Sequence, residues 1–160
     1  RGHGFKAITV EDFRWGRCDI KSTGLLANVL AKQQAADAGE DEAIFVRDNE
    51  VMEGSSTSIF IVKNGVLVTP ANSNRILPGT TRDAALEFGN GLLPIEIRSI
   101  RLDELRTADE VWMSSATRDV LPITQVDGRP IGDGKPGPQW RNMRSAFHDA
   151  QTRLSGTPAL

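Results

Sequence analysis

The stretch SIFIVK-NG-VLVT, from Ser58 to Thr69, predicts a β-hairpin. Both halves are rich in the β-branched and large apolar residues that suit strands. Asn64-Gly65 between them supplies the positive φ angles that a two-residue type I′ turn requires. The hairpin therefore predicts antiparallel pairing in the middle of the chain.

Strand and helix signals alternate on both sides of this hairpin. Further strands are expected at Lys6–Phe13, Arg17–Lys21, Ala43–Arg47, Ile95–Ser99, Glu110–Ser114 and Val120–Val126. Helices are expected after the candidate caps Ser22 or Thr23 and before Gly39, at about Arg82–Phe88, as one turn at Leu102–Arg106, and from Gly137 to about Leu154. Strands and helices in this order predict an α+β or α/β domain with a mixed, mostly antiparallel sheet.

Composition excludes several classes of protein. At 160 residues the chain has the length of about one domain. With 19 Lys and Arg against 21 Asp and Glu, the net charge is −2, which disfavours nucleic-acid binding. No apolar run reaches the roughly 18 residues that cross a membrane. The single cysteine cannot form an internal disulfide, so we expect a cytoplasmic protein.

Two pattern matches carry no function. His3, His148 and Cys18 lack the spacing of metal ligands, so no metal site is expected. Gly132–Gly137 fits the pattern GxGxxG, but it contains a proline and follows a hairpin-like stretch rather than the strand of a βαβ unit. We interpret it as a surface loop.

Four other stretches contain groups with complementary chemistry. Lys21 precedes an apolar helix, and a lysine held in a cleft can lose its proton and react with a carbonyl. Glu53 lies beside a turn of small residues, where a carboxylate can pair with a heteroaromatic nitrogen. Leu77–Arg82 opens a helix whose free N–H groups suit an anion, and Ser114–Thr117 adds further donors. Each stretch alone also fits an ordinary surface, but together they supply what pyridoxal phosphate requires.

The sequence resembles the fold-type IV pyridoxal-phosphate aminotransferases. The resemblance rests on RWGRCDIKS, EAIFVRD, EGSSTSIFIV, ILPGTTR and SSAT with DVLPI, in the family's order over most of residues 5–140. The branch most similar is the D-amino-acid aminotransferases. The resemblance implies a barrel-like sheet with flanking helices, which forms the C-terminal domain (5–154) of a homodimeric enzyme. Residues 1–4 would then be a linker remnant and 155–160 a frayed tail, with the small N-terminal domain absent.

The resemblance also implies roles for individual residues. Lys21 would be the catalytic residue that bonds to the cofactor aldehyde and moves the substrate proton. Glu53 would keep the pyridine nitrogen protonated, and Leu77 would support the ring. The cofactor-binding residues implied are Lys21, Glu53, Ser55, Ser56, Thr57, Leu77, Gly79, Thr80, Thr81 and Thr117.

The implied activity is transfer of an amino group from a D-amino acid to a 2-oxo acid. We expect weak or no turnover from these residues alone, because the family's substrate-side groups lie in the N-terminal domain. Three alternatives remain: a branched-chain aminotransferase, an aminodeoxychorismate lyase of the same fold, and a catalytically silent domain that only binds or dimerises.

Overall fold

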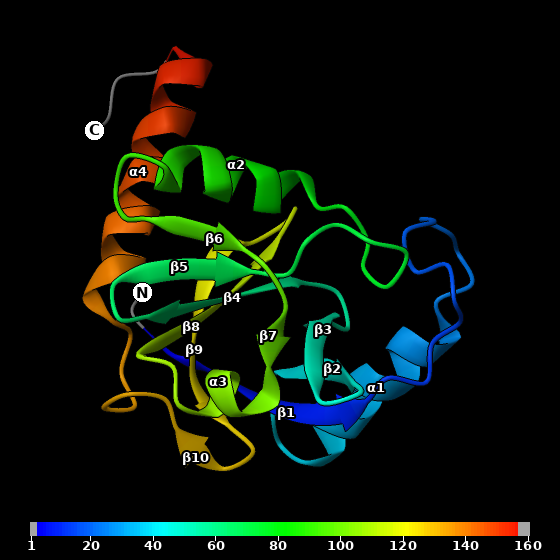
Figure 1. Ribbon diagram of the computed structural model, residues 1–160. Coiled ribbons are helices and arrows are strands. Elements are labelled where there is room, and N and C mark those ends of the chain that lie inside the picture. Colours follow the sequence, from blue (N-terminus) through cyan, green and yellow to red (C-terminus); the bar gives the residue numbers. More distant parts are fainter. Residues whose placement is uncertain (1–2, 157–160) are drawn as a thin grey trace.

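The expected hairpin is formed by β4 (Ser58–Lys63) and β5 (Val66–Thr69), with Asn64 and Gly65 at φ 50° and 75°. The structure is a computed structural model that describes residues 3–156. Residues 1–2 and 157–160, which include parts of the expected linker remnant and tail, lie outside the described residues. Figure 1 shows a strongly curled sheet with helices against its outer faces.

The strands form a single mixed sheet in the order β6-β5-β4-β8-β9-β1-β2-β3-β7, with β10 paired to β9. The strands outside the hairpin are β1 (Phe5–Glu11), β2 (Glu42–Arg47), β3 (Glu50–Gly54), β6 (Ile95–Ile97), β7 (Ile100–Arg101), β8 (Glu110–Ser115), β9 (Asp119–Val126) and β10 (Arg129–Pro130). β1 pairs in parallel with β2 and β9, and β5 with β6, whereas the other pairs are antiparallel. This curled, mostly antiparallel sheet confirms the expected fold class.

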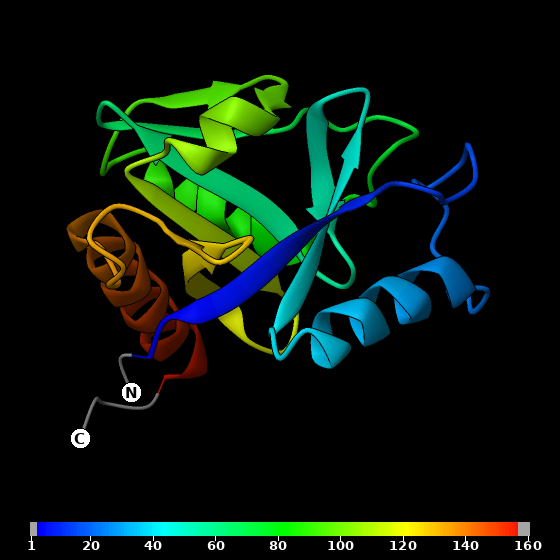
Figure 2. The same ribbon diagram turned by 90° about the horizontal axis from the view of Figure 1, so that it is seen from below.

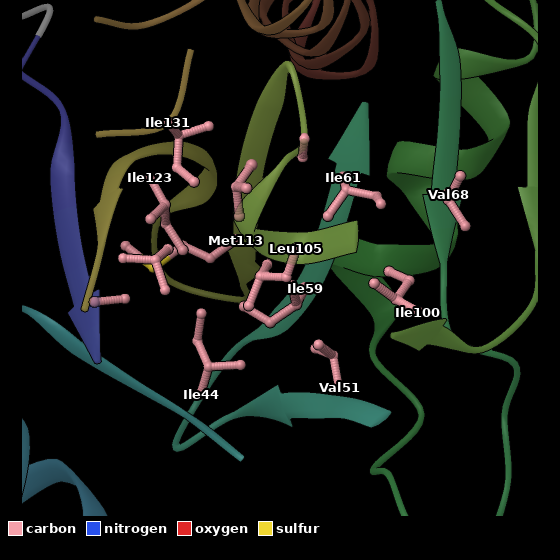
Figure 3. Close-up of a cluster of buried hydrophobic side chains, with 14 residues drawn as sticks. Ile44, Val51, Ile59, Ile61, Val68, Ile100, Leu105, Met113, Ile123 and Ile131 are labelled. Carbon is pink, nitrogen blue, oxygen red and sulfur yellow. The ribbon is translucent and has the colours of Figure 1, made fainter. Parts of the chain in front are cut away.

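The curl gives the sheet an apolar interior. Figure 3 shows Ile44, Ile59, Met113 and Ile123 reaching toward one another from four strands. A second cluster, which includes Phe60 and Trp112, lies between the sheet and the helices α2 (Thr80–Gly89) and α4 (Pro138–Ser155). A third lies beneath α1 (Leu26–Asp37), and α3 (Leu102–Arg106) adds one short turn. No helix within residues 3–156 is long and apolar enough to cross a membrane.

The strand expected at Arg17–Lys21 is wrong. The backbone there forms a turn, because Ile20 N–H bonds to the Arg17 carbonyl at 3.1 Å and Cys18 N–H to the Asn74 carbonyl at 2.7 Å. Contact with a distant loop outweighs the alternating pattern. The strand β3 was not expected, because Asp48 and Asn49, both at positive φ, turn the chain directly back along β2.

The helix α1 exists where expected, but its start and orientation differ. Neither Ser22 nor Thr23 caps it, and its N-cap is Leu25, which makes no side-chain capping bond. The side chains that face the core are Ala31 and Ala35. The larger apolar side chains on this helix therefore remain at the surface.

Candidate functional site

Two loops meet at one end of the sheet, on the right of Figure 1. One follows β1 and leads through Lys21 to α1, and the other connects β5 to α2. Besides the bond from Cys18, the Asn74 side-chain amide donates to the Gly16 carbonyl at 3.1 Å. Within the described residues Lys21 makes no hydrogen bond or ion pair and is exposed, so its amine is free to react.

Glu53, near the end of β3, is a buried carboxylate between these loops. Its Oε1 accepts a bond from the Arg14 guanidinium at 2.5 Å. The Leu77 backbone N–H donates to both oxygens, at 3.1 and 3.2 Å. Burial raises the pKa of Glu53 above its ordinary value, against the opposing effect of Arg14 and the Leu77 amide. The site therefore holds a carboxyl group that sits close to Leu77 and favours a proton-bearing partner.

Arg14 is itself held by a second carboxylate. Its guanidinium forms a two-pronged contact with Asp12, from Nε to Oδ1 at 2.9 Å and from Nη2 to Oδ2 at 3.0 Å. Arg47 approaches the same Asp12 carboxylate at 3.1 Å. Burial raises the pKa of Asp12, but the bonds and charges of the two arginines outweigh it and hold that pKa below its usual range.

Glu42, at the start of β2, organises the turn that follows Glu53. Its carboxylate accepts bonds from the Ser55 hydroxyl and amide, and from the Ser56 and Thr57 hydroxyls at 3.4 and 3.1 Å. A Cβ on Gly54 would overlap the Thr57 hydroxyl and approach the Glu42 carboxyl to 3.2 Å. The three hydroxyls expected to line the cofactor pocket are thus turned toward Glu42.

Sequence reasoning missed Glu42 as a site residue. The signal that could have found it is a charged residue beginning a strand whose next three residues are all buried, since a carboxylate is almost never buried without partners. The three small polar residues at 55–57 were those partners.

The N-terminus of α2 forms a small cradle. Its N-cap is Gly79, with no side-chain capping bond, so the first amides of the helix, from Thr80 onward, keep their capacity to bind an anion. A Cβ at Gly79 would lie 2.9 Å from the Ser58 hydroxyl, a tight contact that glycine avoids. Ser58 pairs across the sheet with Ser114, whose buried hydroxyl has no hydrogen-bond partner in the described part of the chain.

The structure therefore gathers most of the expected site residues around Ser58. The turn of Ser55, Ser56 and Thr57 leads into it, and Gly79 with Thr80 and Thr81 approaches it from α2. Thr117 lies in the hairpin after Ser114, within 3.5 Å of the Ser115 hydroxyl. Glu53 and Leu77 are joined by the hydrogen bonds described above, whereas Lys21 is linked to the group through its loop backbone only.

A separate hollow of about 280 Å³ lies between β9 and α4. Arg118, Trp140, Arg144 and His148 contribute to its wall, and none of the expected site residues does. Among residues 3–156, no group of three or more histidine, cysteine or acidic side chains is placed to hold a metal ion.

Comparison with known proteins identifies the family. The sequence profile of the amino-transferase class IV family matches residues 5–126. The chain belongs to the class IV aminotransferases. It is 43% identical over 150 residues to the D-alanine aminotransferase of Bacillus licheniformis, covering 92% of this chain and 53% of that protein. It is 44% identical over 155 residues to that of Listeria monocytogenes serotype 1/2a, covering 96% and 53%. The chain thus spans about half the length of the curated relatives it matches.

Solved structures agree with this assignment. The branched-chain aminotransferase of Thermoproteus uzoniensis with norvaline superposes with a TM-score of 0.81 at 31% identity, covering 92% of this chain and 52% of that one. The branched-chain amino acid aminotransferase of Escherichia coli gives a TM-score of 0.80 at 29% identity, covering 91% and 52%. A T.th. enzyme of the same name, solved with pyridoxamine 5′-phosphate, gives a TM-score of 0.84 at 31% identity, covering 94% and 52%.

The residues present fit the pyridoxal phosphate that fold-type IV aminotransferases use. The uncapped N-terminus of α2 and the close approach at Gly79 suit its phosphate. The buried carboxylate of Glu53 suits its pyridine nitrogen, and the unpaired amine of Lys21 suits its aldehyde. When bound, this cofactor supplies an electron sink for negative charge on the substrate carbon.

If Glu42 holds the turn at 54–57 in place, Glu42→Gln should destabilise the protein by about 2–4 kcal/mol, because an NH2 group would then face several donors. Amide hydrogen exchange at Ser55 should also quicken. Urea unfolding and exchange measured residue by residue test this. Glu11→Gln, at an exposed strand end, is the control and should change stability by less than about 0.5 kcal/mol. Equal effects of both variants would contradict the role of Glu42.

Proposed function

We propose that this chain is the cofactor-binding part of a pyridoxal-phosphate aminotransferase that transfers the amino group of a D-amino acid to a 2-oxo acid. The observation that supports this most strongly is the buried Glu53 carboxylate, fixed by Arg14 and Leu77 beside a loop that holds an unpaired lysine. A surface turn would leave that carboxylate in water, whereas here it is 7% exposed.

Each residue has a distinct task in this proposal. Lys21 bonds to the cofactor aldehyde and, once displaced by the substrate amine, its Nζ takes the proton from the substrate carbon and returns it one step along. Glu53 accepts a hydrogen bond from the pyridine nitrogen and keeps that nitrogen protonated. The amide of Thr80 and the hydroxyls of Thr81 and Thr117 bind the phosphate, while Leu77 supports one face of the ring.

The proposed substrate class rests on the curated relatives, which are D-alanine aminotransferases at 42–44% identity. The superposed branched-chain enzymes, at 28–32% identity, favour a second candidate, the transamination of branched-chain amino acids. Assays of the protein as its gene encodes it, with D-alanine or L-leucine as donor and 2-oxoglutarate as acceptor, separate the two. Faster turnover of L-leucine would overturn the D-amino-acid assignment.

Substitutions at Lys21 and Glu53 should have different effects on that protein. Lys21→Ala should abolish the visible absorbance band of the lysine-bound cofactor and stop turnover. Glu53→Gln should still bind cofactor but lower kcat by about 100-fold with a smaller change in KM, because charge at the ring matters most as the transition state forms. Absorbance spectra and steady-state kinetics measure both effects. A normal band in Lys21→Ala, or a normal kcat in Glu53→Gln, would contradict the assignment.

We also propose that the chain assembles as a homodimer through an apolar face beside Lys21. Seven large apolar side chains between residues 13 and 30 are exposed, Leu26 and Val29 the most on α1, at 69% and 61%. Contiguous apolar surfaces of this kind mark contact sites in soluble proteins. The members of this face are Phe13, Trp15, Ile20, Leu25, Leu26, Val29 and Leu30.

Charges placed on this face should prevent association. The double substitution Leu26→Glu with Val29→Glu should convert the dimer to a monomer, because two carboxylates would have to leave water on assembly. Leu154→Glu, at an exposed apolar position on α4 (87% exposed), is the control and should leave the dimer intact. Sedimentation at several concentrations measures both. An unsubstituted protein that is monomeric throughout would contradict the proposal.

A further inference from the structure

The Glu53 carboxylate is not an isolated group but the end of a buried chain of charges. Asp12 and Arg14 have side chains 0% and 5% exposed, and that of Glu53 is 9% exposed. Arg47 lies at the other side of Asp12 and is 21% exposed. Two carboxylates and two guanidinium groups thus alternate along the chain, and their formal charges cancel.

The position of Arg14 is strongly constrained. In addition to its two-pronged contact with Asp12, its Nη2 donates to the Arg75 carbonyl at 2.9 Å. One face of the guanidinium covers the Phe45 ring, with its central carbon 4.3 Å from the ring centre. The Nη1 nitrogen that remains points to Glu53. A planar, fivefold donor can satisfy all these partners at once, whereas an ammonium cannot.

The contacts also differentiate the two oxygens of Glu53. Oε1 accepts from both Arg14 and the Leu77 amide, whereas Oε2 accepts, within residues 3–156, only a shared bond from that amide. Oε2 is therefore the oxygen left for a further donor such as a pyridine N–H.

We propose that Arg14 is a positioning residue: clamped by Asp12, it holds Glu53 as an oriented anion and so keeps the shared proton on the cofactor's ring nitrogen. This inference rests on the proposed function. A proton between a buried carboxylate and a pyridine goes to the carboxylate when burial dominates and to the nitrogen when a cation stabilises the anion. Arg14 touches the carboxylate directly, whereas the ring nitrogen lies beyond it, so attraction to the anion exceeds repulsion of the ring.

Other charged groups that face Glu53 do not replace Arg14. Asp12 is a like charge that opposes ionisation of Glu53, and Arg47 contacts Asp12 rather than Glu53. The Cys18 thiol is also near this cluster, and burial raises its pKa, so it stays neutral. Removing Arg14 would therefore leave Glu53 without a neighbouring cation and beside an anion.

The test uses the protein as its gene encodes it, loaded with pyridoxal phosphate labelled with ¹⁵N in the ring. Its readouts are the ¹⁵N chemical shift and the dissociation constant of the cofactor. In Arg14→Gln the shift should move from the protonated toward the neutral position, and the dissociation constant should rise about tenfold, as expected for one lost charge-assisted bond. Arg47→Gln removes a guanidinium that contacts Asp12 but not Glu53, and should keep the wild-type shift.

A wild-type shift in Arg14→Gln, or an equal change in Arg47→Gln, would overturn the inference. If Arg14→Gln does not fold, Arg14→Lys decides. Its ammonium keeps the charge, so the ring should stay protonated, but it cannot bridge both carboxylates, so cofactor binding should weaken about tenfold. Wild-type affinity in Arg14→Lys would contradict a positioning role. Failure of the unsubstituted protein to bind the cofactor would instead contradict the proposed function.

Discussion

Burial of the Glu53 carboxylate is the constraint on which the site depends. A carboxylate removed from water is costly unless cations and hydrogen-bond donors replace the water. Here the donors come from the loop after β1 through Arg14 and from the loop before α2 through Leu77. The need to satisfy one charge therefore joins three segments that lie far apart in the sequence.

A second carboxylate extends the same principle to the neighbouring turn. Glu42 on β2 collects the hydroxyls that follow β3, and Figure 2 shows these two strands paired beside β1, away from α2 and α4. The two glutamates thus fix both ends of the segment 53–57. The apolar core beneath them gives the strands their curvature, but the charged groups determine where the loops lie.

Much of the fold could be predicted from local sequence. The hairpin around Asn64-Gly65 and the helix at α4 depend on turn residues and periodic patterns within a few positions. The turn at Arg17–Lys21 could not, because its shape is set by a bond between Cys18 and Asn74, which no local pattern reveals. The exposed stripe of α1 was missed for a similar reason, since periodicity finds a helix but not the side that has a partner.

The site followed the same division. Glu53, Leu77, Gly79 and Thr80 were found because each lies in a short motif, whereas Glu42 and the linking role of Arg14 emerge only from contacts across the fold. The central claim is that Lys21 binds the cofactor within this arrangement. Borohydride reduction of the cofactor-loaded protein followed by peptide mapping tests it most directly. The account predicts the pyridoxyl label on Lys21, and a label on Lys6, Lys32 or Lys63 instead would contradict it.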